Sequence, residues 1–420
     1  MSESTVELFE TKPELTKEER RVPVYSDTEP PTIPSEVGHG TPLESLRLNW
    51  REKDLPEKAR TKHVHRLHPY LGKFIPQLVE IFLRKYFEPH QTVLDPFCGS
   101  GTTLVQANEL GIDAIGYDIS AFNVLLTRAK VRKYSIGRVR TEVLDALDKL
   151  RRLTQSTGQL GLWQERAAEL EIPQTDNEYL QKWYAPRSLD ELLTYRYLIQ
   201  NEGYLYQDLL KIILSRSARS ARLTTHYDLD VPKKPQTEPY WCYKHSRTCN
   251  PTMEAFKFIN RYSLDTLRRI EEFARLRTHA KSKVRHTDSR RANFPAIDGV
   301  ITSPPYVGLI DYHDQHAYAY HLLGLRDRRE AEIGPAVNGS SQKTQRQYQL
   351  DIANVFQRAV DSIKRGGWII VVIHDRSNLY PEIASMCGVE VVAELDRHVN
   401  RRTGRRSSEF YESIFMWRKA

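Results

Sequence analysis

The chain has 420 residues and a formal net charge of +8, and 28% of its residues are charged. This length favours two or three domains, and the excess of basic side chains suits a polyanionic partner such as nucleic acid. No apolar run approaches the roughly 18 residues of a membrane-spanning helix, and the N-terminus lacks the basic and apolar regions of a secretory signal. Four cysteines are too few for a disulfide framework in a chain of this length. We therefore expect a cytoplasmic protein without membrane contact.

The N-terminal segment, residues 1–41, is polar and rich in proline and acidic side chains. It has too few apolar groups to offset the entropy lost on ordering. We expect a flexible or surface-hugging arm. A loop through His68, Pro69 and Tyr70 follows it and leads into a helix with apolar side chains at helical spacing.

The first predicted strand, residues 92–94, runs into a glycine-rich turn and then a helix. The turn reads Asp95-Pro96-Phe97-Cys98-Gly99-Ser100-Gly101-Thr102-Thr103. Glycines permit positive φ and let a ligand approach the backbone, and the helix N-terminus presents unpaired N–H groups. Such a turn alone can hold a dinucleotide, a phosphate or nothing.

The second predicted strand, residues 113–117, ends at Asp118, Ile119 and Ser120. An acid about 20 residues after a glycine turn, at the tip of the next strand, is placed to accept both hydroxyls of a ribose. The alternative is an aspartate that caps the following helix.

Between about residues 138 and 277 the alternation of strands and helices gives way to helical patterns, which predicts an inserted domain. The insertion is basic in its second half, with Arg216, Arg219 and Arg222 at short spacing and then Lys244 and Arg247 among aromatic residues. Such side chains contact phosphates and read guanine in the major groove. We expect these five residues to bind DNA, and the alternative is a solvated basic helix face.

Cys242, His245 and Cys249 are residue types that bind zinc. They lack a fourth ligand and any Cys-x-x-Cys pair. We therefore predict no metal site.

The strand pattern returns at residues 283–288, which end in Asp288 although the strand is unusually polar. A buried strand then stops at Ser303, Pro304, Pro305 and Tyr306. Two prolines fix φ and remove two backbone donors, so the carbonyl groups of this shelf stay available to a ligand. Ser303 adds a hydroxyl and Tyr306 a flat face the size of a nucleobase.

The remaining chain completes the sheet. Residues 311–318 are rich in His and Tyr, and we favour pocket lining or packing over a metal cluster; residues 338–343 have the composition of a loop that can serve as a lid. A helix and the apolar strand 368–373 follow, and residues 389–395 and 413–417 are expected to close the sheet as an antiparallel hairpin. Between them lies a second candidate DNA contact, residues 397–406, which hold no acid and five arginines, Arg397, Arg401, Arg402, Arg405 and Arg406.

Two motifs carry a family resemblance. The run from Thr302 to Tyr306 resembles the catalytic motif of the amino-methylating DNA methyltransferases, in its cytosine-N4 form, and the turn from Asp95 to Thr103 resembles their S-adenosylmethionine loop. The resemblance covers roughly residues 62–130 and 283–420. It implies a Rossmann-like class I methyltransferase fold of the α/β class, with a mostly parallel sheet and a terminal antiparallel hairpin, in residues 42–137 and 278–420. The mainly helical insertion, residues 138–277, is then the target-recognition domain.

The resemblance also implies S-adenosyl-L-methionine as cofactor. In it Asp118 accepts the ribose hydroxyls, Ile119 packs on the adenine and Asp288 accepts from the adenine amine. The motif order resembles the alpha class, except that the insertion falls before Asp288. The positions that match the family's cofactor-binding residues are His68, Pro69, Tyr70, Asp95, Pro96, Phe97, Gly99, Ser100, Gly101, Thr102, Thr103, Asp118, Ile119, Ser120, Asp288 and Thr302.

The implied reaction takes place on a base flipped out of the duplex and stacked on Tyr306. Its amine donates to the Ser303 hydroxyl and the Pro304 carbonyl, so that Ser303, Pro304, Pro305 and Tyr306 form the catalytic shelf. The expected product is N4-methylcytosine; adenine-N6 methylation, RNA methylation and a non-catalytic DNA-binding module are the alternatives. We expect a nucleoid-associated monomer that acts on double-stranded DNA, with a cognate restriction endonuclease as a candidate partner.

Overall fold

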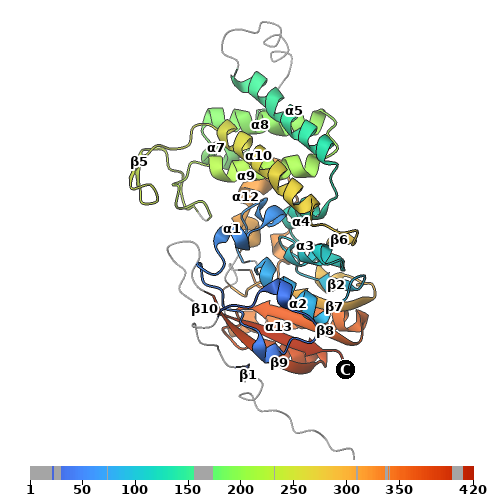
Figure 1. Cartoon of the computed structure of the whole chain (residues 1–420). Coiled ribbons are helices and arrows are strands. Elements are labelled where there is room, and N and C mark those ends of the chain that lie inside the picture. The colour runs from blue at the N-terminus through green and yellow to red at the C-terminus, as the bar shows by residue number, and fades with distance from the viewer. Residues whose placement is uncertain are drawn as a thin grey trace, which may run out of the picture.

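The computed structural model describes residues 21–22, 30–72, 74–155, 174–230, 232–308, 311–335, 339, 341–399 and 410–420. Within them a twisted sheet with helices on both faces carries a helical region beyond one end of its strands (Figure 1). No helix of the described residues is both long and apolar enough to cross a membrane.

The sheet has the order β1-β9-β10-β8-β7-β2-β3-β6. All neighbouring strands run parallel except β10, which is antiparallel to both β8 and β9. This confirms the Rossmann-like sheet with a terminal antiparallel hairpin. The strands are β1 (Arg21–Val22), β2 (Thr92–Asp95), β3 (Asp113–Asp118), β6 (Ser282–His286), β7 (Ile297–Thr302), β8 (Ile363–Ile373), β9 (Glu390–Val399) and β10 (Phe410–Arg418).

Strand β6 lies at the end of the sheet order, beside β3. Its side chains alternate between half-buried and exposed, with Lys283 and Arg285 exposed. Charged side chains on an edge strand discourage pairing with another chain. The polarity of this strand therefore follows from its position at the edge.

Two hydrophobic cores, one on each face, hold the helices to the sheet. Along β8, Ile370 and Val372 belong to one core, while Ile369, Val371 and Ile373 belong to the other, as the period of two of a strand requires. Helices α2 (Pro76–Tyr86), α3 (Thr102–Glu109) and α4 (Ala121–Val131) pack in the first core, and α13 (Gln342–Ser362) and α14 (Tyr380–Cys387) pack in the second.

The chain leaves the sheet region after α4 and returns at β6, so the insertion precedes the strand of Asp288. The segment between is mainly helical, as predicted, and is coloured green to yellow in Figure 1. Helices α5, α8, α9 and α10 pack against one another, and α9 also packs against α4 and α12 (Ala317–Leu323). Its elements are α5 (Ile136–Gln155), α7 (Glu178–Trp183), α8 (Pro186–Asn201), α9 (Gln207–Ala221), β4 (Tyr240–Cys242), β5 (Arg247–Cys249) and α10 (Phe256–Ala274).

Residues 21–22 and 30–41 are the described part of the N-terminal arm, and they contact the sheet region: β1 pairs with β9 at the end of the sheet. The Thr32 N–H donates to the Arg47 carbonyl at 2.9 Å, and Val37 is buried in the first core. Most of residues 1–29 lie outside the described part of the chain. Shorter helical elements are η1 (Pro34–Glu36), η2 (Leu43–Ser45), α1 (Glu57–Arg60), η3 (His63–Arg66), η4 (Ser289–Arg291), α11 (Tyr312–Gln315) and η5 (Arg329–Ala331).

Candidate active site

A cleft with about 790 Å³ of space lies at the carboxyl ends of β2, β3 and β7. Ligands of open parallel sheets bind at this edge. Most of the predicted cofactor and catalytic residues line it. They are Tyr70, Pro96, Phe97, Gly99, Ser100, Thr102, Asp118, Ile119, Ser120, Asp288, Ser303 and Pro305.

The glycine turn is shaped by its two glycines. Gly101 has φ +77°, and a Cβ atom there would lie 2.5 Å from the Cγ2 of Thr127, so no other residue fits without a shift. The Thr127 hydroxyl donates to the Gly99 carbonyl at 2.9 Å, and the buried Lys130 donates to the Ser100 carbonyl at 2.6 Å. Helix α4 therefore holds the turn in place through Thr127 and Lys130, which the sequence did not suggest as site residues.

Asp118 lies at the tip of β3 with its carboxylate on the cleft. It accepts from the N–H groups of Gly99 and Ser120 at 2.8 Å each, and the Asn123 amide lies 3.2 Å from both of its oxygens. Burial raises the pKa of Asp118 to about 6, and these hydrogen bonds oppose the shift. Asp118 thus fixes the turn, and its carboxylate lies on the cleft.

Asp95 and Thr302 connect the glycine turn to strand β7. The Thr302 hydroxyl donates to Asp95 at 2.7 Å, and both side chains are fully buried behind the cleft. Burial raises the pKa of Asp95 to about 6, against the hydrogen bond from Thr302, and its second oxygen has no partner among the described residues. These two residues position the site and do not line it.

The catalytic shelf lies between two cavities. Ser303 and Pro305 line the first cleft, while Tyr306 lines a second cavity of about 660 Å³ together with Tyr348 and Tyr380. Within the described chain, the buried Ser303 hydroxyl has no partner of hydrogen-bonding geometry. Burial raises the pKa of Tyr306.

The carbonyl groups of the shelf are not all available, which corrects the expectation from the two prolines. The Pro305 carbonyl accepts from the Tyr348 hydroxyl at 2.9 Å, and Tyr348 contacts the Tyr380 hydroxyl at 2.8 Å. The sequence argument missed this bond because Tyr348 is 43 residues away on α13. No hydrogen bond to the Pro304 carbonyl is found in the ranges that the structure describes. Two acceptors therefore remain, the Ser303 hydroxyl and the Pro304 carbonyl.

Comparison with known proteins agrees with this geometry. A family model described as DNA methylase matches residues 13–127. The type II methyltransferase M.MjaII of Methanocaldococcus jannaschii is 37% identical over 430 residues, which span 86% of this chain and 81% of that protein. The chain belongs to the amino-methylating DNA methyltransferase family.

More distant relatives of this methyltransferase were also found. The type II methyltransferase M.BsoBI of Geobacillus stearothermophilus is 20% identical over 322 residues, covering 68% of this chain and 58% of that one. Among solved structures, the rRNA methyltransferase aviRa of Streptomyces viridochromogenes aligns with a TM-score of 0.31 and 13% identity, over 84% of this chain and 89% of that chain.

The cofactor of this methyltransferase family is S-adenosyl-L-methionine, and the residues of the first cleft fit it. A Cβ atom at Gly99, where φ is +46°, would lie 3.1 Å from the Tyr70 hydroxyl, so the turn leaves room only for backbone. Asp118 is suited to ribose hydroxyls. The Ser100 hydroxyl is buried without a partner among the described residues, and Phe97 and Ile119 offer apolar surface on the cleft.

Asp288 lines the cleft of the methyltransferase, but its carboxylate is already engaged. It caps η4 by accepting from the Arg290 N–H at 3.0 Å, and the Arg290 guanidinium binds it at 2.8 Å. Burial acts to raise the pKa of Asp288, but the bonds from Arg290 outweigh it and lower the pKa. An adenine amine would share this carboxylate with Arg290.

His68 and Pro69 do not line the cleft. His68 is buried where α9 meets the sheet region: its Nε2 lies 3.2 Å from the Ser215 hydroxyl, and its ring packs edge-on against Phe122. Sequence adjacency suggested a cofactor wall at His68, Pro69 and Tyr70, and of these three residues Tyr70 reaches the cleft. Cleft residues that the sequence analysis missed are Gly72, Phe74, Asn123, Ser289, Ala331, Glu332 and Ile333.

The His-rich stretch after the shelf packs and lines the cleft, which agrees with the reading favoured from the sequence. Tyr312 lines the cleft and stacks on Tyr70. His316 is buried and stacks on Phe122 with 4.4 Å between ring centroids, and His313 is bound by Glu332.

The arginines of α9 that were predicted to bind DNA have partners within the protein. Arg216 is buried, forms an ion pair with Asp265 at 2.8 Å and lies over the Tyr262 ring at 4.1 Å. Arg222 is also buried and lies over the Tyr318 ring at 4.7 Å, and Arg219 is paired with Asp230. These guanidinium groups are consumed within the protein, so they are not available to phosphates.

The other candidate DNA contacts have different positions. Lys244 and Arg247 are exposed on the β4–β5 hairpin. Arg397 is buried and forms an ion pair with Glu412 at 2.9 Å. Arg401, Arg402, Arg405 and Arg406 lie outside the described residues, as do residues 338 and 340 of the predicted lid at residues 338–343.

Proposed function

We propose that this DNA methyltransferase methylates the exocyclic N4 amine of a cytosine flipped out of duplex DNA. The observation that supports the proposal is the pair of acceptors on the shelf. The Ser303 hydroxyl is buried, lacks a partner within the described chain and lines the cofactor cleft, while Tyr306, three residues on, lines the neighbouring cavity.

The residues of the shelf act by positioning. A base stacked on Tyr306 brings its amine to the Ser303 hydroxyl and the Pro304 carbonyl. Hydrogen bonds to these acceptors direct the nitrogen lone pair away from the ring system, so that the amine becomes nucleophilic. Ser303 is too weak a base to remove a proton before attack, so the N–H proton leaves afterwards, from the cationic product.

The bound cofactor supplies an electrophilic methyl group on its sulfonium. The chain's own contribution is to hold the turn that receives it. Asp118 binds the Gly99 N–H, and Thr127 and Lys130 bind the consecutive carbonyl groups of Gly99 and Ser100. Thr302 connects the turn to the shelf through Asp95.

The choice of base rests on Ser303. Adenine-N6 methyltransferases with a similar motif usually carry a carboxylate or an amide at the position of Ser303. The smaller hydroxyl of Ser303 suits the smaller base, cytosine. The Pro304 carbonyl serves either amine, so adenine-N6 methylation is the second candidate.

We also propose that the insertion, residues 138–277, recognises the target sequence, with Lys244 and Arg247 on the β4–β5 hairpin in contact with phosphates. Both side chains are exposed, and exposed basic residues supply most non-specific affinity for DNA. The proposed partners are duplex DNA and a cognate restriction endonuclease, and the proposed state is a monomer.

Mass spectrometry of nucleosides tests the product. Duplex DNA is treated with the wild-type protein and S-adenosylmethionine and then digested, with Ser303→Ala as the control. We expect N4-methylcytosine from the wild type and a large loss with the variant. N6-methyladenine without N4-methylcytosine would overturn the base and leave the shelf mechanism intact.

A further inference from the structure

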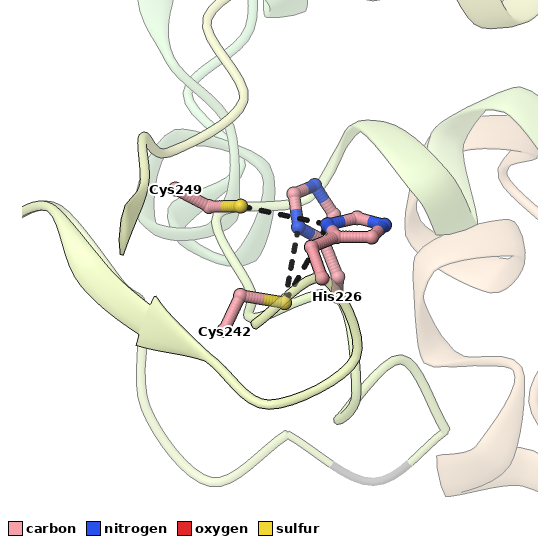
Figure 2. A group of neighbouring side chains, drawn as sticks. His226, Cys242 and Cys249 are labelled. Carbon is pink, nitrogen blue, oxygen red and sulfur yellow. Dashed lines mark hydrogen bonds between the residues drawn. The ribbon is translucent and has the colours of Figure 1, made fainter. Parts of the chain in front are cut away.

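Four metal-binding side chains meet on the hairpin of the insertion. His226 comes from the segment after α9, Cys242 and Cys249 come from strands β4 and β5, and His245 comes from the turn between those strands. One ligand atom from each lies within 4.8 Å of the others. Figure 2 shows the sulfur atoms of Cys242 and Cys249 pointing toward the imidazole rings of the cluster.

The spacing of these atoms matches tetrahedral coordination. Zinc binds sulfur at about 2.3 Å and imidazole nitrogen at about 2.0–2.1 Å, so sulfur and nitrogen ligands of one ion lie about 3.6 Å apart. The Cys242 sulfur lies 3.7 Å from Nδ1 of His226 and 3.6 Å from Nδ1 of His245. The Cys249 sulfur lies 3.5 Å from Nδ1 of His245.

The pairing of the strands places both thiols on one face of the hairpin. Tyr240 is opposite Cys249, and Cys242 is opposite Arg247, so the two cysteines are diagonal neighbours. Diagonal residues lie about 7–8 Å apart, whereas the Cα atoms of a disulfide lie about 4.4–6.8 Å apart. The geometry therefore favours a shared ion over a disulfide bond.

We propose that His226, Cys242, His245 and Cys249 form a structural Zn²⁺ site of the Cys₂His₂ type. The sequence argument against a metal rested on a missing fourth ligand, and the structure supplies it in His226, which is 16 residues before Cys242. All four positions are filled by protein side chains, as in structural rather than catalytic zinc sites.

The β4–β5 hairpin needs such a cross-link to be stable. A two-stranded hairpin is marginally stable alone, and this one exposes large side chains, with Trp241 53% and Tyr243 59% exposed, while Cys242 is fully buried. The Tyr240 hydroxyl accepts the backbone N–H of His226 at 2.9 Å, which holds this segment beside the hairpin. Zinc binding would stabilise the folded hairpin in place of apolar packing.

A second group of possible metal ligands does not support a metal site. His63, His65 and Glu109 offer only three ligand atoms. Lys62 also binds Glu109 at 2.9 Å, so a positive charge already occupies that carboxylate.

Metal analysis of the full-length protein tests the site. The protein is purified without a polyhistidine tag under reducing conditions, and zinc is measured by inductively coupled plasma mass spectrometry. We expect one zinc per chain in the wild type and in Cys387→Ala, which removes a buried thiol on α14. Zinc should be lost in the Cys242→Ser, Cys249→Ser double variant.

A milder variant keeps the test decisive if the double variant fails to fold. His245 is exposed, so His245→Ala should fold and should bind zinc at least about tenfold more weakly in competition with a chelator. Cobalt substituted into the wild type should give the intense visible bands of tetrahedral coordination and a thiolate charge-transfer band. A wild type that neither contains zinc nor takes it up from zinc chloride, an unchanged zinc affinity in His245→Ala, or a Cys242–Cys249 disulfide in thiol-blocked protein would overturn the proposal.

Discussion

Asp118 combines two tasks in one side chain, since it holds the glycine turn and faces the cofactor cleft. We predict that Asp118→Ala weakens S-adenosylmethionine binding by about 1.5–3 kcal/mol, the scale of charge-assisted hydrogen bonds. Isothermal titration calorimetry measures this, with Asp190→Ala as a control because Asp190 is an exposed acid on α8. Unchanged affinity in a folded variant would remove the ribose role.

Asp95 should make stability depend on pH. Burial raises the pKa of Asp95 to about 6, above the unfolded value of about 3.9. Because its pKa is raised, the protonated Asp95 contributes to the stability of the folded protein below about pH 4, and this contribution is lost as pH rises through about 6. The same direction holds for Asp118.

We therefore predict that Asp95→Asn stabilises the cofactor-free protein relative to wild type by up to about 2 kcal/mol more at pH 7.5 than at pH 4.5. Urea unfolding at the two pH values measures the difference. Asp190→Asn serves as the matched substitution at an exposed site. An equal effect of Asp95→Asn at both pH values would show that the buried carboxyl titrates normally.

Ser303 and Tyr306 should separate turnover from binding. Ser303→Ala should lower the single-turnover rate by about tenfold or more, because one hydrogen bond is worth about 1.4 kcal/mol, and should change DNA affinity little. Tyr306→Ala should lose about 1–3 kcal/mol of base stacking, whereas Tyr306→Phe keeps the ring. Rapid-quench kinetics and equilibrium DNA binding distinguish the two effects. If Ser303→Ala lost only affinity, the hydroxyl would not act in the reaction.

At the scale of elements, α9 and the β4–β5 hairpin should respond in opposite ways to the loss of positive charge. Replacing both Lys244 and Arg247 with Ala should lower the salt slope of DNA binding by about 1 per phosphate contact and leave the melting temperature unchanged. Arg216→Ala should leave that slope unchanged and cost about 1–3 kcal/mol of stability, because it breaks the pair with Asp265. Salt titrations and thermal melts test both, and a change of slope in Arg216→Ala would return α9 to the DNA interface.

The contrast between these elements shows what the sequence could predict. Asp118 and Ser303 were identified because their motifs are local, and a strand tip puts a local motif at the sheet edge. Arg216 was misjudged because its partner, Asp265, is 49 residues away on α10. His226 was missed for the same reason, since only the folded chain brings it to Cys242.

At the scale of the whole molecule, the insertion and the sheet region share one hydrophobic core. Leu209 and Ile213 of α9 belong to the same core as Val93 and Ile301 of the sheet. We predict a single cooperative thermal transition, because neither part can lose its packing alone. Differential scanning calorimetry should give equal calorimetric and van't Hoff enthalpies, and two separated transitions would mean that the insertion folds on its own.

The bonds of Asp118 join three neighbouring segments before any cofactor arrives. Its carboxylate holds the turn after β2, and its carbonyl accepts the Thr287 N–H at 3.0 Å, just after β6. The entropy of ordering this pocket is thus lost during folding and not at binding. Cofactor exchange between turnovers then requires no refolding of the turn, and the heat-capacity change of binding should reflect little more than the apolar surface that the cofactor itself covers.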